Sequence, residues 1–420
     1  MKTIITSASL AALGAISIQA AYQPGLSSTE RAKPWSVSAS LRGFYDDNYT
    51  TLPSKRNDGG PTKRDSFGVE VSPGLSLNFN PTEQTLASLS YVYAMRWYED
   101  RENNSADHSH QVNAKLDHAF TENYKIDLSD SFVVAQEPQI IDPAQITLPL
   151  RANGDNIRNT AMARFTADFT RLFGTEVGYS NTYYDYEQDG VNSYSAFLDR
   201  MEHLMFVNLR YRVMPQTVGI FGYQYGINNH NSDDPITNFG SPDVRDSRSH
   251  YIYVGADHTF TPRINASARI GAQYTEYPNA DEYIGPGDLD DSSWIPYADV
   301  SASYAYTQGS YAQLGIRHSR VQTDIVALDQ EATTIYGSIN HQITPKLIGR
   351  VLGQFQDSSF NQGINDERAE QYYLVGLNFE YMINQFLSAE TGYNFDRLDS
   401  DVQNRSYTRN RVYIGIRASY

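Results

Sequence analysis

The chain of 420 residues contains no cysteine, which removes disulfides, thiolate metal sites, cysteine nucleophiles and a lipid anchor on cysteine. Basic residues are also scarce. The formal net charge is −16, so nothing here would neutralise the phosphates of a nucleic acid, and we expect no nucleic-acid partner. Beyond the N-terminal region no run of about 18 apolar residues occurs, which argues against a transmembrane helix. A membrane is not excluded, because only alternate residues of a β-barrel face lipid and the mean hydropathy, here −0.52, then stays low.

Catalytic motifs are missing as well. The chain has no Gly-x-Ser-x-Gly elbow, no His-Glu-x-x-His helix and no phosphate-binding Gly-x-x-x-x-Gly-Lys. We therefore expect no enzyme activity, no cofactor and no metal centre. His108 and His110 could bind a metal or act as a base, but we favour a place at the headgroup end of a lipid-facing stripe. His118, His258 and His341 each lie beside a short turn, which suits an interfacial anchor better than a ligand set.

A short turn recurs through the chain and joins runs in which apolar and polar residues alternate. It is clearest at residues 117–125, 257–265 and 340–347, and looser versions occur at 79–83, 172–175, 213–217, 306–309 and 381–385. Each version has an aromatic or aliphatic residue, then a tight turn rich in Thr, Pro, Gly or Asn, then a new alternating run. Strand, short turn and strand make a β-hairpin, and a hairpin about every 40 residues indicates a repeat architecture.

The alternation predicts about 18 strands, with 16–20 as the range, each long enough to cross a membrane at a tilt. In residues 64–80, for example, Phe67, Val69 and Val71 share one face, while Glu70 and Ser72 share the other. The predicted strands span 34–46, 64–80, 84–99, 107–120, 123–136, 156–170, 175–188, 197–213, 217–230, 246–260, 264–277, 291–306, 310–324, 331–343, 346–357, 367–382, 386–399 and 406–420. The fold class is all-β, a transmembrane antiparallel up-and-down β-barrel over residues 34–420.

Three features favour a membrane barrel over a soluble sandwich or propeller. Short and long connections alternate throughout, as short periplasmic turns and long outer loops do in outer-membrane barrels. Aromatic residues close the apolar faces at both strand ends, which is typical of interfacial anchors. Charge also differs between the ends, because the long loops are acidic while the short turns carry Lys125, Arg171, Arg263 and Lys346.

The N-terminal region reads as an export signal. Lys2 supplies a positive start, residues 4–18 a short apolar segment, and Ala20 a small residue at the cleavage site. We interpret residues 1–20 as a signal peptide and residues 21–33 as a periplasmic lead-in; the alternative is a buried N-terminal helix.

The C-terminal strand ends on an aromatic residue, with apolar residues at alternate positions before it: Tyr420 follows Ile414 and Ile416 on one face. This pattern resembles the C-terminal assembly signal of Gram-negative outer-membrane proteins. Over nearly all of the mature chain the sequence is similar to the porin-like β-barrel family that is associated with polysaccharide export or uptake. The resemblance implies a place in the outer membrane of a Gram-negative bacterium. The partners it implies are membrane lipid and lipopolysaccharide, the barrel-assembly machinery during insertion, and small hydrophilic solutes; it leaves a homotrimer open.

The lumen is the favoured functional region. The predicted inward charges are Arg42, Arg164, Arg210, Arg212, Arg269, Arg317, Arg350, Arg417, Glu70, Asp117, Asp168 and Glu380. So wide a barrel cannot fill its interior with side chains, and charged rings in a water-filled pore set solute selectivity. The alternative is that these charges form cross-strand ion pairs that only stiffen the wall. The acidic outer loop with Asp288, Asp290 and Asp291 could bind Ca²⁺ or Mg²⁺, although simple surface solubility explains it better.

We expect a porin-like channel for passive diffusion of small hydrophilic solutes. One alternative is a specific saccharide or polysaccharide channel, favoured by inward tyrosines that could stack on sugar rings: Tyr251, Tyr253, Tyr311, Tyr336 and Tyr372. Another is a plugged structural or adhesion barrel that acts through its outer loops.

Residues 136–151, the third outer loop, are unusually apolar for an exposed connection. In porins the third outer loop folds inward, so the resemblance implies a constriction here, with Asp142 and Arg151 facing the inner-wall arginines. A lid over the mouth or a subunit contact are the alternatives. Deletion of residues 139–150 is expected to raise single-channel conductance and broaden solute selectivity, because the narrowest part of the pore would be removed. Unchanged conductance and selectivity in a planar bilayer would contradict the constriction.

Overall fold

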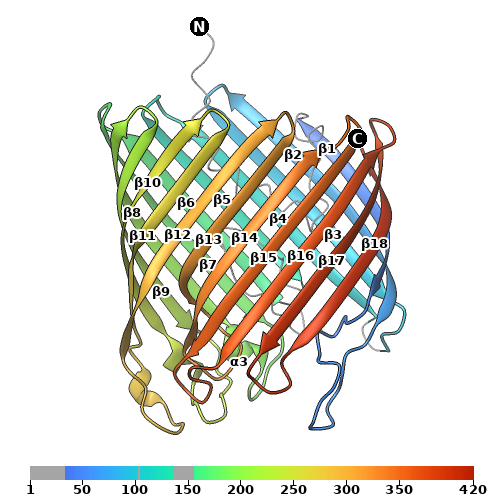
Figure 1. Ribbon diagram of the computed structural model, residues 1–420, viewed down its shortest axis with the longest axis vertical. Coiled ribbons are helices and arrows are strands. Elements are labelled where there is room, and N and C mark those ends of the chain that lie inside the picture. Colours follow the sequence, from blue (N-terminus) through green and yellow to red (C-terminus); the bar gives the residue numbers. More distant parts are fainter. Residues whose placement is uncertain (1–33, 103–104, 136–155) are drawn as a thin grey trace.

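The computed structural model describes residues 34–102, 105–135 and 156–420. Within them the chain forms a single closed sheet of 18 antiparallel strands. Each strand pairs with its neighbours in sequence, and β1 pairs with β18 to complete the ring (Figure 1). The predicted strand number and barrel are therefore confirmed. The predicted signal peptide, the lead-in and the third outer loop with Asp142 and Arg151 lie outside the described residues.

The first nine strands are β1 (Trp35–Asp46), β2 (Ser66–Thr82), β3 (Thr85–Tyr98), β4 (Ala106–Ala119), β5 (Tyr124–Ala135), β6 (Asn156–Asp168), β7 (Phe173–Tyr186), β8 (Arg200–Met214) and β9 (Thr217–His230). The others are β10 (Ser247–Thr261), β11 (Ile264–Glu276), β12 (Ser292–Thr307), β13 (Ser310–Val321), β14 (Asp329–Gln342), β15 (Leu347–Asn361), β16 (Ala369–Met382), β17 (Leu387–Ser400) and β18 (Tyr407–Ser419). In the described part of the chain, three short helical turns lie between strands: α3 (Tyr194–Leu198), η2 (Pro242–Arg245) and η3 (Ala280–Glu282). None of the helices in the described ranges is long and apolar enough to cross a membrane.

Alternate side chains of every strand face two different environments. In β2, Phe67 is 60% exposed on the outer face, whereas Glu70 is 5% exposed on the inner face. The same alternation continues around the ring, with apolar side chains such as Leu41, Val254 and Ile414 on the outside. Exposed apolar side chains on a closed ring of strands form the surface that contacts lipid.

The two ends of the barrel differ. Short turns close one end, and in several of them one side chain accepts hydrogen bonds from the backbone N–H groups two and three residues ahead. Thr170, Thr261, Thr344 and Asn384 all do this. This local capping explains the recurring turn pattern, because Thr and Asn side chains mimic a backbone turn. The long connections, among them 47–65, 187–199, 231–246 and 277–291, leave the other end, at the bottom of Figure 1.

The C-terminus completes the barrel at the short-turn end. The backbone N–H of Tyr420 donates to the carbonyl of Val37 at 2.9 Å, and Val37 donates back at 3.1 Å. The ring of Tyr420 lies 5.6 Å from Trp35 and 5.9 Å from Phe386. Ile414 and Ile416 point outward, 71% and 50% exposed. The predicted assembly signal therefore lies on the lipid-facing side of the seam, and its role in assembly remains a prediction.

Inner-face aromatic rings lie against glycines of neighbouring strands. A Cβ added at Gly68, Gly178, Gly222, Gly315 or Gly392 would meet the ring of Phe44, Phe206, Tyr253, Tyr336 or Tyr413, respectively. Each ring therefore lies along the wall, over a strand without a side chain, and not toward the barrel axis. This arrangement protects the glycine backbone and keeps these rings against the wall.

Gly392→Ala is expected to destabilise the barrel by about 1–3 kcal/mol, because the new methyl group would overlap the ring of Tyr413. Gly43→Ala is the matched control, since nothing lies within 4 Å of a Cβ built at that position. Urea unfolding of both variants in detergent micelles measures the difference. Equal midpoints for the two variants would contradict the packing role of the glycine.

Candidate functional site

The inner face of the barrel carries the predicted pore-lining charges. Strand alternation places all of Arg42, Glu70, Asp117, Arg164, Asp168, Arg210, Arg212, Arg269, Arg317, Arg350, Glu380 and Arg417 opposite the exposed apolar face. Their contact with a solute remains a prediction. What the structure adds is how these charges are arranged.

Arg42 of β1 is the centre of the most connected group of charges. Its Nε donates to Oε1 of Glu390 at 2.6 Å and its Nη2 to Oε2 at 3.0 Å, while its Nη1 donates to Glu70 at 3.0 Å. Glu70 also accepts a hydrogen bond from Arg96. Arg42 reaches β17 by crossing β18 at Gly415, where a Cβ would lie 2.7 Å from its Cγ. This charged network joins β1, β2 and β3 to β17 across the seam between β1 and β18.

Most other inner-wall charges are paired in the same way. Arg317 bonds Asp299 at 2.7 Å, Arg269 bonds Asp257 at 2.8 Å, and Arg350 bonds Glu380 at 2.8 Å. The remaining pairs are Lys115 with Asp117, Arg164 with Asp127 and Arg210 with Asp168. Arg417 donates to Ser38 at 3.3 Å. Within each pair the opposite charges offset one another's field along the wall.

The tyrosines predicted to stack on sugars are more buried than that role requires. Tyr253 and Tyr372 are 2% exposed and Tyr336 is 5% exposed. The Tyr253 hydroxyl donates to Asn208 at 2.7 Å and its ring lies over Gly222. These three rings are buried, whereas Tyr251 and Tyr311 are half-buried. The strand register places a glycine beneath two of the buried rings, Tyr253 and Tyr336. Stacking of any of the five on a sugar stays a prediction.

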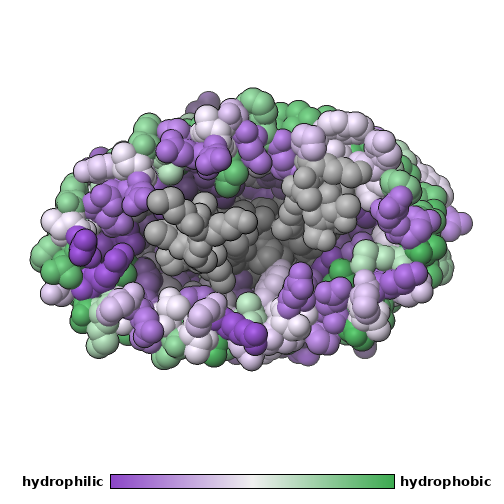
Figure 2. Space-filling model, turned by 90° about the horizontal axis from the view of Figure 1, so that it is seen from above, coloured by the Kyte–Doolittle hydropathy of each residue, from purple (hydrophilic) through white to green (hydrophobic). Residues whose placement is uncertain are grey.

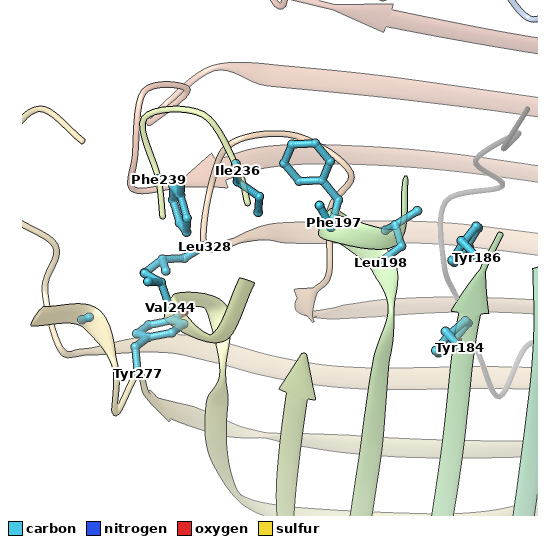
Figure 3. Close-up of a cluster of buried hydrophobic side chains, with 11 residues drawn as sticks. Tyr184, Tyr186, Phe197, Leu198, Ile236, Phe239, Val244, Tyr277 and Leu328 are labelled. Carbon is cyan, nitrogen blue, oxygen red and sulfur yellow. The ribbon is translucent and has the colours of Figure 1, made fainter. Parts of the chain in front are cut away.

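Four outer loops fold together into a compact cap, which the sequence did not predict. Its buried residues are Tyr184, Tyr186, Ala196, Phe197, Leu198, Ile236, Phe239, Val244, Tyr277, Ala280 and Leu328 (Figure 3). Phe197 and Leu198 belong to α3 and pack with Tyr184 and Tyr186, which lie on the inner face of β7. This loop therefore occupies space inside the wall and narrows the outer mouth. The sequence signal that could have indicated the cap is the presence of apolar residues, such as Ile236 and Leu328, in otherwise polar loops.

A buried arginine ties the cap together. Arg245, at the end of η2, is 0% exposed and donates to the carbonyl oxygens of Phe197 at 2.6 Å, of Leu328 at 3.4 Å and of Thr323. These three acceptors lie in two other loops. Burial lowers the pKa of the Arg245 guanidinium from its usual value. The guanidinium is the group best suited to this position, because its planar fork donates several hydrogen bonds at once.

Two carboxyl groups lie in the same cap. Burial raises the pKa of Asp199 to about 6, although the carboxylate accepts hydrogen bonds from Ser195 and from the N–H of Tyr186. Burial likewise raises the pKa of Asp246 to about 6, while Asp246 accepts from the N–H of His230 at 2.7 Å. The cap therefore combines apolar packing with polar groups held by the backbone, and it is a folded unit of the outer end.

The structure also places the histidines that the sequence singled out. His108 and His110 lie on the outer, lipid-facing side of β4, and their Nδ1 atoms are hydrogen-bonded to Tyr93 and Tyr91 at 2.8 and 2.9 Å. This agrees with the favoured interpretation of an interfacial position. Within the described residues no group of three or more His, Cys, Asp or Glu side chains could hold a metal ion.

A family model described as "Putative beta-barrel porin 2" matches residues 36–420. No curated protein matches the chain significantly. Among solved structures, the chain is similar to a BenF-like porin from Pseudomonas fluorescens Pf-5, at 9% identity and a TM-score of 0.45, over 92% of this chain and 99% of that one. It is also similar to the outer membrane protein opdK from Pseudomonas aeruginosa (12% identity, TM-score 0.41) and to OccAB4 from Acinetobacter baumannii (12%, 0.44), each with the same coverage.

Arg245→Met is expected to loosen the cap without unfolding the barrel, because it removes hydrogen bonds to three carbonyl groups that lie in two neighbouring loops. Limited proteolysis of the refolded protein should then cut residues 187–199 and 322–328 at least about tenfold faster. Arg248→Met, at an exposed position three residues later, is the matched control. Equal cutting of both variants would show that Arg245 does not hold the loops.

Proposed function

Since this chain belongs to the family of β-barrel porins described as "Putative beta-barrel porin 2" and is an outer-membrane protein of the Gram-negative type, we propose that it is a passive channel for small hydrophilic solutes. Solutes would cross by diffusion through a polar lumen lined by paired charges. No chemical step is assigned to any residue, and we propose that the protein is not an enzyme.

The observation that carries this proposal is the largely polar inner face of a barrel of 18 strands. A barrel of eight strands can be filled by its own side chains, whereas barrels of about 16 to 18 strands leave an aqueous channel. Here the bulky inner rings lie against glycines along the wall, which favours an open centre. Seen from the short-turn end, many of the side chains on the inner edge of the oval are hydrophilic (Figure 2).

Two constrictions fit this channel. The cap narrows the mouth on the side of β7 through α3. The third outer loop, with Asp142 and Arg151, remains a proposal from the sequence alone. The paired inner-wall charges support weak selectivity between cations and anions, because most of the inner-wall arginines pair with a carboxylate that offsets their field.

Two other functions remain in competition. A saccharide channel is supported by the half-buried Tyr251 and Tyr311 on the inner face. A plugged barrel that acts through its loops is supported by the folded cap. Lipopolysaccharide, the barrel-assembly machinery and a homotrimer also remain proposals; no observation on the inner wall bears on them.

Single-channel conductance of the refolded protein in a planar bilayer, with salt gradients and a panel of sugars, tests the proposal. A steady open current with weak ion preference is expected. Block by a sugar would favour the saccharide channel, and no current from folded protein would favour the plugged barrel. The double variant Glu380→Gln and Glu390→Gln removes two negative charges, one beside Arg350 and one from the group around Arg42, where Glu70 remains. The resulting excess of positive charge should shift the reversal potential toward anions.

The matched control is Asp399→Asn. It removes a carboxylate that also pairs with an arginine, Arg397, but on the exposed outer face of β17. The control should leave the reversal potential unchanged. If the double variant leaves it unchanged as well, the paired charges do not line the path of the ions.

A further inference from the structure

A groove crosses the lipid-facing surface of β11 to β15, near the short-turn end of the barrel. It has a volume of about 420 Å³. The small residues Ala302, Ala312 and Gly337 form its floor. It is bordered by larger side chains: Ile264, Tyr304, Leu314, Ile339 and Val351. β12 to β15 lie at the front of the barrel in Figure 1, with their short-turn ends at its upper rim.

The strand register explains the groove. Ala302, Leu314 and Gly337 lie side by side on β12, β13 and β14, and the next row contains Tyr304, Ala312 and Ile339. Small and large side chains are thus offset between the two rows, and the small ones form a channel between the large ones. In a membrane this surface contacts hydrocarbon. If the groove were empty, the side chains that line it would lose van der Waals contacts, which is energetically unfavourable.

Polar and basic groups lie at the short-turn end of the groove. The hydroxyl of Tyr306 is hydrogen-bonded to Nδ1 of His341 at 2.9 Å, which leaves Nε2 as the second hydrogen-bonding atom of that ring. Tyr306 also packs beside Tyr304, with ring centroids 5.6 Å apart. Nη1 of the exposed Arg263 donates to the carbonyl of Tyr306 at 3.5 Å, so the guanidinium lies at the same place.

The charge at this end is positive and uncompensated. Within the described residues, neither Arg263 nor Lys346 of the neighbouring turn forms an ion pair with a carboxylate. The turns between β10 and β15 at this end, residues 262–263, 308–309 and 343–346, contain no acidic residue. An arginine at a membrane boundary that has no carboxylate partner suits a phosphate group, which its fork can bind with two hydrogen bonds.

We propose that the groove and the basic end together bind one anionic glycerophospholipid of the periplasmic leaflet. One acyl chain lies in the groove over Ala302, Ala312 and Gly337, and the phosphate contacts Arg263, with Tyr306 and His341 beside it. The occupant is a lipid because the groove opens on the hydrocarbon region and ends at a cationic site at headgroup level. The proposal needs only the membrane position of the barrel and is independent of what the lumen transports.

Native mass spectrometry of the refolded protein in detergent, with dioleoylphosphatidylglycerol added, tests this site. The unmodified protein should retain one lipid per chain. Arg263→Ala should weaken retention roughly tenfold, because a charge-assisted hydrogen bond is lost. Ala312→Leu should abolish it by filling the groove. Dioleoylglycerol has the same acyl chains but no phosphate. The unmodified protein and Arg263→Ala should therefore retain it equally weakly.

Matched controls separate the site from general effects. Arg171→Ala changes an exposed basic residue in the turn between β6 and β7, and Ala163→Leu enlarges a lipid-facing alanine of β6. Both should retain the lipid as the unmodified protein does. Equal weakening in the controls, or equal retention of dioleoylglycerol, would overturn the proposal. The proposal would also be overturned if the unmodified protein formed a dimer without bound lipid and Ala312→Leu dissociated that dimer. The groove would then hold a second copy of the chain. Heat-modifiable mobility on gels confirms that each variant is folded.

Discussion

The closure of the backbone ladder between β1 and β18 is the constraint on which the structure depends. Inside a membrane no water is available to satisfy an unpaired N–H or C=O group, so a sheet can span lipid only if it has no edge. Here the ring closes with regular antiparallel pairing from Ser38 with Ser419 to Asp46 with Arg411. The chain ends reinforce the seam, because Val37 and Tyr420 exchange two hydrogen bonds and Trp35 packs against the terminal ring.

Side chains on the inner wall support the same seam. Arg42 spans from β1 across Gly415 of β18 to Glu390 of β17, and Arg409 of β18 bonds the fully buried Asp46 of β1. Such pairs are buried against the wall, and each charge there needs its partner. The contacts that close the barrel therefore also offset charges on its inner wall. Glycines on the neighbouring strands leave room for the rings of Tyr253, Tyr336 and Tyr413 to lie along the wall.

The two ends of the barrel have different chemistry. At the outer end, loops fold into a cap around the buried Arg245, so that this end is shaped by tertiary packing of segments far apart in sequence. At the periplasmic end the connections are short and locally capped by Thr and Asn side chains, and basic residues such as Arg263 and Lys346 lie exposed. A barrel with an acidic, folded outer end and a basic, compact inner end has a defined orientation in an asymmetric membrane.

The sequence by itself determined the strands, their number and their faces. Period-two alternation is a local property, so Phe67 and Glu70 could be assigned to opposite faces without knowing their neighbours. The inward arginines were predicted for the same reason. Only the tertiary structure decided their partners, because Arg42 and Glu390 are separated by 348 positions and meet through the closure of the ring. The cap likewise arises from contacts between distant loops. The register between strands decides the burial of Tyr253 and Tyr372 and the groove over Ala302, Ala312 and Gly337. No local pattern encodes these features, since each one depends on which residues the register brings side by side.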